Sequence, residues 1–320
     1  MPAYPAQPRA AVIGGGTMGA DVAAVFARAQ CPVAIVEPAE ARRESLPAYL
    51  RAALGDFAHL AELVTLVSEL DMVDWRGIDL VVECAPERLD VKQALFARLE
   101  ELAPADAVLA SNSSSFPIGR IAAGLRTAQR MYGLHFFMPA HLVPLVEVVM
   151  GPASLPGGAQ QLAEFMRRCG RVPVLVRKDL PGFLANRLQH ALSREAFNLI
   201  DEGVASPEDV DAAVRFGFGF RFLAAGPVMQ RDHGGLDIHS AAGATIYPSL
   251  SNTDRPAEAL RSRVDAGRTG MKSGAGFYDW TPASMQAERA RYDAILHGAL
   301  RLLEDELPPV QPGPPQWRSA

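Results

Sequence analysis

A glycine-rich turn near the amino terminus restricts the fold of this chain more than any other feature. Arg9–Ile13 is a short apolar run, Gly14-Gly-Gly-Thr-Met-Gly19 follows it, and Ala20–Ala29 has the apolar spacing of a helix. The order is therefore strand, glycine turn and helix, with the spacing G-x-G-x-x-G. Such glycines allow a tight turn, close approach of a pyrophosphate, and close packing of helix on strand. Free N–H groups at the start of the helix would bind the phosphates.

The next predicted strand strengthens the case for a dinucleotide site. Val33–Val36 ends in Glu37, twenty-one residues after Gly16, where an acidic side chain can hold a ribose 2′-hydroxyl. A carboxylate would repel a 2′-phosphate, which favours NAD over NADP. Arg42 and Arg43 are close enough in sequence to offset that repulsion. The alternative is a glycine turn that binds no ligand.

Strands and helices continue to alternate through the first half of the chain. Further strands are predicted at Val64–Val67, Asp79–Glu83, Ala107–Ala110, Met131–Leu134 and Val172–Val176. Helices are predicted at Ala39–Leu54, with Pro47 starting a second helix, and at Asp90–Leu102 and Gly158–Cys169. This alternation predicts an α/β fold with a Rossmann-type, doubly wound and mainly parallel sheet. Ligands of such sheets bind beyond the carboxyl ends of the strands.

One candidate pair of catalytic side chains lies in Gly133–Val149, where two apolar runs flank a turn. His135 follows the first run and Glu147 lies inside the second, so the two side chains can meet across a hairpin. A buried carboxylate beside an imidazole fixes its tautomer and stabilises its charged form. The structural alternative is a core histidine satisfied by a core glutamate. The position of His135 at a predicted strand end favours a site residue.

The second half of the chain is predicted to be helical. Its helices are expected at Phe183–Glu202, Val210–Phe216, Gly226–Ala242 and Pro282–Glu306. Ser206-Pro-Glu-Asp209 has the pattern of a capping box. The predicted organisation is a flexible N-terminus (1–8), a Rossmann domain (9–180), a helical substrate and dimerisation domain (181–306) and a disordered proline-rich tail (307–320).

The bulk composition excludes several classes of protein. The 320 residues carry a net charge of −5, which gives no reason to expect nucleic acid or an anionic membrane as a partner. No apolar run reaches the length of a membrane span, and Met1–Pro8 has no apolar signal core. The three cysteines are isolated, which suits a reducing compartment and predicts no metal site. We expect a soluble cytoplasmic protein.

Several ordered motifs together resemble the L-3-hydroxyacyl-CoA dehydrogenase family over nearly the whole chain. They are Gly14–Gly19, Glu83–Lys92, Asn112–Ser115, His135–Glu147, Pro181–Arg187 and Lys272–Tyr278. The resemblance implies an NAD-dependent oxidoreductase in which His135 is the catalytic base and Glu147 its partner. It implies that Ser114 and Asn186 bind the reacting oxygen of the substrate. The implied cofactor-binding residues are Gly14, Gly16, Thr17, Met18, Gly19, Glu37, Glu87, Lys92, Asn112 and Lys272.

The resemblance also carries expectations about assembly. Asn186 would belong to the second domain, so domain closure would complete the site and expel water. The helical domain would pair with a second copy to form a homodimer. Structural alternatives remain for three residues. Ser114 could cap a helix, Asn186 could bond the linker backbone, and Lys92 could be a solvated helix charge.

Two departures from the family pattern bear on the substrate. Relatives that act on acyl-CoA carry a longer, lysine-rich helical insert after the second strand, whereas Pro38–Ile78 is short, net acidic and without lysine. The usual asparagine three residues after the catalytic histidine is Met138, which has no amide donor. Arg221 and Asp232–Asp237 look more like the L-gulonate, carnitine and pyridine-carboxylate dehydrogenases. Arg221 could bind a substrate carboxylate or form a structural ion pair.

Three hypotheses about function follow. The leading one is an NAD-dependent dehydrogenase of a 3-hydroxyacyl-CoA or a short 3-hydroxy acid. The second keeps the chemistry but replaces the thioester with a free hydroxy or aldehyde carboxylic acid, a class that includes aromatic acids. The third is a non-catalytic NAD-binding protein, like the lens crystallin that shares this family's fold, because Met138 is compatible with impaired catalysis. Relative turnover of acetoacetyl-CoA and free acids separates the first two, and steady NADH production excludes the third.

Overall fold

Eight strands form a single sheet in the computed structural model, which describes residues 9–315; the predicted flexibility of residues 1–8 lies outside that range. The strands are β1 (Ala10–Ile13), β2 (Val33–Val36), β3 (Val64–Val67), β4 (Leu80–Glu83), β5 (Val108–Ser111), β6 (Met131–Phe136), β7 (Leu145–Met150) and β8 (Val172–Val176). Their spatial order is β3-β2-β1-β4-β5-β6-β7-β8. All neighbouring strands are parallel except β6 and β7. The predicted doubly wound, mainly parallel sheet is confirmed.

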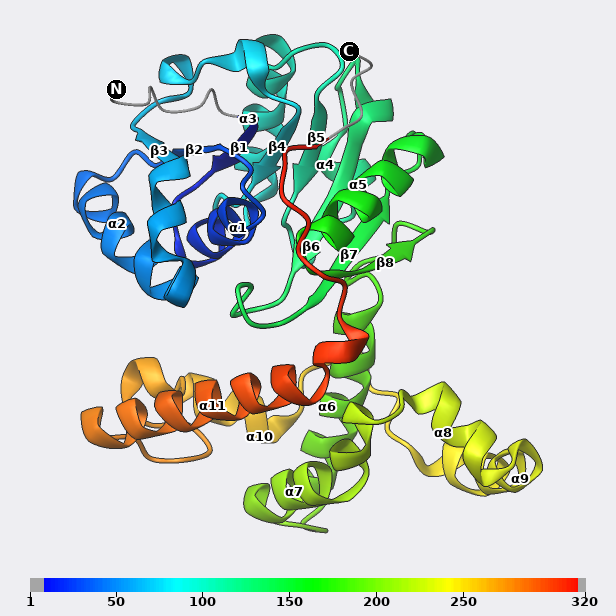
Figure 1. Ribbon diagram of the computed structural model, residues 1–320. Coiled ribbons are helices and arrows are strands. Elements are labelled where there is room, and N and C mark those ends of the chain that lie inside the picture. The colour runs from blue at the N-terminus through cyan, green and yellow to red at the C-terminus, as the bar shows by residue number, and fades with distance from the viewer. Residues whose placement is uncertain (1–8, 316–320) are drawn as a thin grey trace. The chain divides into compact units, whose positions relative to one another are not determined.

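Helices cover both faces of this sheet (Figure 1). One face carries α1 (Thr17–Arg28), α2 (Glu40–Leu54) and α5 (Pro156–Arg168), and its buried core includes Phe26 and Phe165. The other face carries α3 (Leu89–Leu102) and α4 (Ile118–Ile121), with its own buried cluster. The strands are buried on both sides because α/β crossovers place helices on both faces. The chain order reverses between β1 and β4, so the carboxyl ends of these two strands flank the crevice where such folds bind ligands.

The prediction that Pro47 starts a new helix is wrong, because α2 runs through it. Proline removes one backbone hydrogen bond inside a helix and clashes with the preceding turn. Leu46 and Leu50 lie on either side of Pro47, and both are buried in the core against the sheet. We infer that this packing holds the two halves of α2 in one helix.

The chain divides into two compact units, and α6 (Ala185–Asp201) crosses the boundary between them. The first unit is Met1–Asn186 together with Asp305–Ala320, and the second is Arg187–Glu304. The second unit contains most of α6 and five further helices. They are α7 (Pro207–Ala213), α8 (Pro227–Gly234), α9 (Leu236–Ile246), α10 (Glu258–Asp265) and α11 (Pro282–Leu302). None of the helices between residues 9 and 315 is long and apolar enough to cross a membrane.

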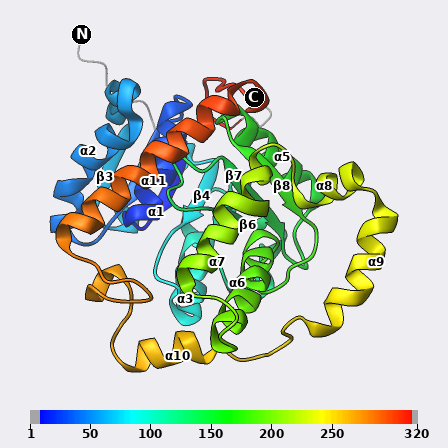
Figure 2. The same ribbon diagram turned by 90° about the horizontal axis from the view of Figure 1, so that it is seen from below.

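Two features of the helical unit test the local predictions. Ser206 is the N-cap of α7, and its hydroxyl accepts a hydrogen bond from the backbone N–H of Asp209, as the capping pattern predicts. The single helix predicted at Gly226–Ala242 is wrong, because α8 and α9 are separated by Gly235. Gly235 has a φ of +91°, a conformation that glycine adopts readily and that ends a helix. Figure 2 shows α8 and α9 following one another as separate helices.

The described part of the proline-rich tail is ordered, which corrects the prediction of disorder for 307–320; residues 316–320 lie outside the described range. The tail belongs to the first unit. The backbone N–H of Gln311 donates to the Arg168 carbonyl at 2.8 Å, and that of Gly313 donates to the Ala29 carbonyl at 2.8 Å. Val310 also forms an isolated antiparallel bridge with Cys169. Backbone pairing with the ends of α1 and α5 therefore outweighs the low order that proline-rich composition favours.

Candidate active site

The glycine turn has the geometry that a pyrophosphate site requires. Gly14 has a φ of +105°, and a Cβ there would lie 2.7 Å from the Cys84 carbonyl oxygen on the neighbouring strand end. A Cβ on Gly19 would lie within van der Waals overlap of the Gly14 carbonyl, so close packing of α1 on β1 demands glycine. A Cβ on Gly16 would meet nothing within 4 Å. Gly16 therefore borders open space at the start of α1, where free N–H groups can bind phosphate.

Glu37 lies at the carboxyl end of β2 and faces this turn. Its Oε2 accepts the backbone N–H of Gly15 at 2.8 Å, which leaves further lone pairs for a ribose hydroxyl. Arg42 Nε donates to the Gly15 carbonyl at 2.7 Å. Arg43 Nη1 donates to the carbonyls of Glu37 and Pro38 at 2.7 and 2.6 Å. Both arginines are thus held by backbone oxygens, while a carboxylate remains at the ribose position, an arrangement that fits NAD better than NADP.

His135 and Glu147 occupy directly opposed positions on the antiparallel strands β6 and β7. His135 Nδ1 lies 2.7 Å from Glu147 Oε2, and the two residues are 4% and 0% exposed, so this pair is sealed from solvent. Glu147 Oε1 accepts the backbone N–H groups of Leu184 and Ala185 at 3.0 and 2.7 Å. With Nδ1 occupied by Glu147, Nε2 is the imidazole nitrogen that can exchange a proton with a bound molecule.

A pocket of about 400 Å³ opens beside this histidine at the carboxyl ends of the strands. Its lining includes seven residues that the sequence indicated, namely Met18, Glu87, Lys92, Asn112, Ser114, His135 and Asn186. Cys84, Ala85, Phe136, Phe137 and Met138 complete it. The Phe137 ring lies 4.5 Å from the imidazole ring, between centroids. The fold therefore brings together residues from five separate stretches of the chain around one imidazole.

Ser114 and Asn186 meet at the edge of this pocket. Asn186 Nδ2 donates to the Ser114 carbonyl at 3.2 Å, which leaves the serine hydroxyl without a partner among residues 9–315. Ser114 is not a helix cap, because α4 begins later and has Pro117 at its N-cap. Asn186 is the last residue of the first compact unit before the second begins at Arg187. The contact between these two residues therefore does not require domain closure.

A network of charged side chains holds the loop Ser113–Ser115 in place. Lys92 Nζ lies 2.7 Å from Glu83 Oε1 and 3.2 Å from Glu87 Oε2, and its side chain is 1% exposed. Lys92 is thus a buried ion-paired residue, not the solvated helix charge considered from sequence. Glu87 Oε1 also accepts the hydroxyls of Ser113 and Ser115 and the backbone N–H of Ser114. The network joins α3 to the loop that carries Ser114.

The ionisation of Glu87 contributes to the stability of this network. Partial burial disfavours the charged form, but hydrogen bonds from Ser113 and Ser115 and the ammonium of Lys92 outweigh it. The pKa of Glu87 therefore lies below its ordinary value. Because the folded-state pKa is the lower one, the contribution is present above the unfolded pKa and disappears as pH falls through the folded value.

Two predicted site residues, Lys272 and Arg221, belong to the second unit. Lys272 lies in the short helical turn Met271–Ser273 and is exposed. Arg221 lies in the turn Gly219–Leu223, is exposed, and its guanidinium has no ion-pair partner in the described range. Their roles in binding remain predictions.

Two residues of the site, Glu83 and Phe137, were given no individual role from the sequence. Glu83 is 0% exposed and accepts hydrogen bonds from Lys92, Ser111 and the Ala85 backbone. Its signal was available, because an acidic residue ends the buried run of β4. Phe137 follows His135 by two residues, but its contact with the imidazole depends on the path of the β6–β7 turn.

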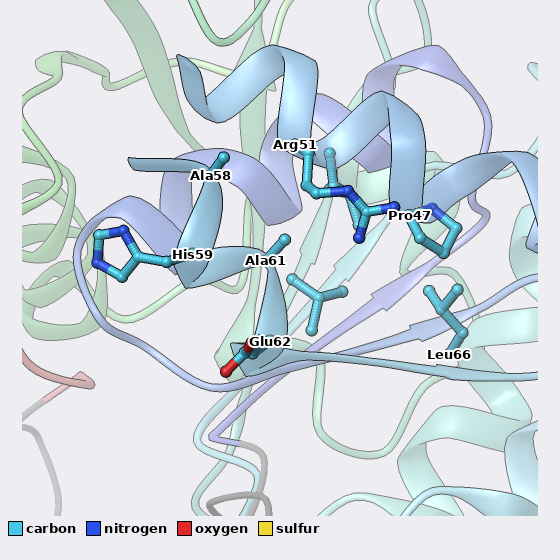
Figure 3. Close-up of a pocket in the computed structure, with 9 residues that line it drawn as sticks. Pro47, Arg51, Ala58, His59, Ala61, Glu62 and Leu66 are labelled. Atoms are coloured by element: carbon cyan, nitrogen blue, oxygen red, sulfur yellow. The ribbon is translucent and has the colours of Figure 1, made fainter. Parts of the chain in front are cut away.

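A second pocket of about 280 Å³ lies between α2, the segment Gly55–Leu63 and the edge strand β3 (Figure 3). Its floor is apolar and includes Leu50, Val64 and Leu66. The polar side chains at its rim, Arg51, His59 and Glu62, belong to exposed residues. It therefore has no buried polar group with which to orient a ligand, in contrast to the pocket beside His135.

Two protein-family models match the chain. The model of the 3-hydroxyacyl-CoA dehydrogenase NAD-binding domain matches residues 9–180. The model of the 3-hydroxyacyl-CoA dehydrogenase C-terminal domain matches residues 182–280.

Curated relatives and solved structures differ in substrate. The 5-formyl-3-hydroxy-2-methylpyridine 4-carboxylate 5-dehydrogenase of Mesorhizobium japonicum is 35% identical over 291 residues, which cover 88% of this chain and 94% of that protein. A crystal structure of such an enzyme, described as an NAD⁺-dependent dismutase, has a TM-score of 0.88 and 32% identity, covering 93% of this chain and 99% of that one. A 3-hydroxybutyryl-CoA dehydrogenase structure from Escherichia coli has a TM-score of 0.70 and 34% identity, covering 86% of this chain and 60% of that one.

Proposed function

We propose that this chain, which belongs to the 3-hydroxyacyl-CoA dehydrogenase family, oxidises a hydroxyl or hydrated aldehyde carbon of a small free carboxylic acid. The chain is an NAD-dependent oxidoreductase that acts on CH–OH groups. When bound, NAD accepts the hydride from the substrate carbon. The observation that carries the proposal is the buried His135–Glu147 pair, whose imidazole borders a pocket beside the glycine turn.

The placement of the residues supports a role for each of them. His135 Nε2 removes the hydroxyl proton of the substrate, and the imidazolium that forms lies against the carboxylate of Glu147. Two backbone N–H groups also donate to Glu147 and hold its carboxyl group beside the imidazole. The Ser114 hydroxyl and the Asn186 amide lie at the pocket edge, where they can donate hydrogen bonds to the oxygen that becomes a carbonyl.

The preference for a free acid rests on the segment that follows β2. Between Pro38 and Ile78 the chain is net acidic and contains no lysine, so it offers a poor surface for the phosphates of coenzyme A. The rim of the Figure 3 pocket carries one arginine, Arg51, and one carboxylate, Glu62, so these two charges offset one another and offer no cationic cluster. The TM-score of 0.88 with the pyridine-carboxylate enzyme against 0.70 with the acyl-CoA enzyme supports the same preference. Arg221 is our candidate for binding the substrate carboxylate.

A 3-hydroxyacyl-CoA is the second candidate substrate, because family membership and the E. coli enzyme both favour it. We expect the purified chain to reduce NAD⁺ with at least one free hydroxy or aldehyde carboxylic acid at a higher kcat/KM than with 3-hydroxybutyryl-CoA. NADH absorbance across a panel of both classes, with acetoacetyl-CoA in the reverse direction, measures this. A clear preference for the thioester would reject the free-acid assignment, and NADP⁺ in place of NAD⁺ serves as the cofactor control.

We also propose that the chain forms a homodimer through the helical unit. Both buried hydrophobic clusters consist of residues outside Arg187–Glu304, so this unit has no core of its own. Large apolar side chains are exposed along it, including Leu188 (59%), Phe220 (70%), Val228 (78%) and Tyr247 (72%). Exposed apolar surface on this scale is typical of an interface. A second copy is the partner that this family resemblance implies.

The dimer is expected to appear as twice the 34.3 kDa chain mass in light scattering after size-exclusion chromatography. Leu188→Glu and Val228→Glu each place a charge on the apolar surface and should shift the protein toward monomer. A matched exposed change on the first unit, Leu155→Glu, should leave the mass unchanged. A monomer at all concentrations would contradict the proposal.

A further inference from the structure

A buried carboxylate on the phosphate-binding helix lies outside the catalytic residues named above. Asp21 is in α1, two residues after the last glycine of the turn, and it is 0% exposed. A buried carboxylate is expensive unless it is paired and hydrogen-bonded. Asp21 is satisfied by residues from two distant segments.

Both oxygens of Asp21 are engaged. Oδ1 accepts the hydroxyl of Tyr49 at 2.7 Å, and Oδ2 accepts the backbone N–H of Ala140 at 2.8 Å. His141 Nδ1 lies 3.0 Å from Oδ1, close enough for an ion pair, although the ring makes no aligned hydrogen bond there. Tyr49 comes from α2, while Ala140 and His141 come from the turn between β6 and β7. Asp21 thus joins three segments of the first unit.

The same turn is held from its other side by Arg171. Its Nη1 lies 3.2 Å from the Ala140 carbonyl and 3.4 Å from the Val143 carbonyl, and the residue is 5% exposed. Burial lowers the pKa of Arg171 to about 10, while Asp21 favours its charged form. The backbone N–H of Ala140 therefore donates to the buried carboxylate of Asp21, and its carbonyl accepts from the buried guanidinium of Arg171.

This turn also forms a wall of the active-site pocket. Phe137 and Met138 line the pocket with His135, and the Phe137 ring contacts the imidazole at 4.5 Å between centroids. Met138 is 65% exposed. Its thioether cannot donate a hydrogen bond to a bound molecule, so such a bond cannot hold the turn in place. The position of this wall therefore depends on the buried side chains of Asp21 and Arg171, which bind the backbone of Ala140.

We propose that Asp21 is a positioning residue, which locks the Phe137–Pro144 turn to the phosphate-binding helix and thereby fixes the pocket wall against His135. The inference rests on the proposed function, because it assumes that the hydride acceptor lies between this wall and the imidazole. One helix would then set both ends of the cofactor site. Its amino-terminal glycine turn binds the pyrophosphate, and its next turn carries the carboxylate that places the active-site wall. Asp21 touches no reacting atom in this scheme.

The test compares three changes. Asp21→Ala removes the contacts that Asp21 makes with the turn. It should lower kcat about 10²-fold with the same substrate, because small displacements of reacting groups have effects of that order. Asp21→Asn keeps an oxygen for the Ala140 N–H and an amide for Tyr49, so it should recover most of kcat. His141→Ala removes only the ion pair from a partly exposed position and should give an intermediate loss.

Asp79→Asn is the matched control for loss of a buried carboxylate. Asp79 is 0% exposed, pairs with Arg9 just before β4, and lies at the opposite end of the strands from the pocket. This variant should lower the melting temperature and leave kcat unchanged. If Asp21→Ala does not fold, Asp21→Asn and His141→Ala carry the test. Wild-type kcat in Asp21→Ala and His141→Ala, with only a lower melting temperature, would overturn the proposal. Wild-type kcat in His141→Ala would do the same if it were the only variant to fold.

Fluorescence of bound NADH separates this proposal from the substrate assignment, because it needs no substrate. Asp21→Ala should change the emission of bound NADH, because the proposal would place the nicotinamide beside the turn, while the NADH dissociation constant stays close to wild type. Asp79→Asn should change neither. Altered emission together with no turnover of any hydroxy acid by the wild-type chain would refute the proposed function alone. Unchanged emission in Asp21→Ala would refute the positioning role alone.

Discussion

Replacement of His135 by glutamine is expected to lower kcat by about 10²- to 10⁴-fold, the range for loss of a general base. Glutamine retains a hydrogen bond to Glu147 but cannot accept the hydroxyl proton of the substrate. The rest of the pocket lining and the glycine turn are unchanged, so the dissociation constant for NADH should stay near the wild-type value. Stopped-flow measurement of NADH formation with the best substrate of the panel gives kcat, and fluorescence titration gives the NADH affinity.

Glu147→Gln is the companion change. It keeps the shape of the side chain but removes the charge that stabilises the imidazolium, and it places an amide where the backbone N–H groups of Leu184 and Ala185 donate. We expect kcat to fall substantially in this variant too, and less than additively in the double variant, because the two residues act as a unit. Undiminished turnover in His135→Gln would show that another group removes the proton and would reject the mechanism.

Replacement of Lys92 by methionine is expected to destabilise the fold by about 3 to 5 kcal/mol, because it leaves a buried carboxylate without its counter-charge. Glu83 is 0% exposed and has Lys92 Nζ at 2.7 Å, so water cannot take the place of the ammonium at low energy. The free energy of unfolding, from urea titration followed by circular dichroism, measures this. A loss of the Glu87 contact would accompany it, loosening the loop that carries Ser114.

Two controls separate charge from packing. Lys178→Met makes the same chemical change at an exposed lysine of the first unit and should alter the stability very little. Glu83→Gln in the Lys92→Met background removes the uncompensated charge and should restore much of the lost stability. If Lys92→Met and Lys178→Met unfold at the same urea concentration, the buried ion pair is not a source of stability.

The parts of the fold that the sequence revealed depend on local patterns. Each of these patterns is formed by residues that lie close together in the sequence. They are the glycine spacing, the alternation of strands with helices, and the buried runs of the strands. The pairing of His135 with Glu147 was accessible for the same reason, because a short hairpin brings residues twelve apart face to face. The errors at Pro47 and Gly235 arose where packing and a single backbone angle decided whether a helix continued.

Other features depended on contacts between residues far apart in the chain. Asp21 and Ala140 are 119 residues apart, and no periodicity of either segment indicates that they meet. The tail beyond Glu306 reads as disordered by composition, yet its backbone pairs with the ends of α1 and α5. Lys92 looks like a surface residue of a helix until the fold places Glu83 beneath it. In each case the partner is set by the packing of whole elements.

The sequence by itself thus determined the family, the glycine turn and the pairing of His135 with Glu147, because these are encoded in spacings along short stretches. Only the tertiary structure decided which unit supplies Asn186, what Lys92 neutralises and which carboxylate holds the turn beside His135. The physical reason is that buried charges and backbone groups must find partners wherever packing leaves them, and packing acts between elements distant in sequence.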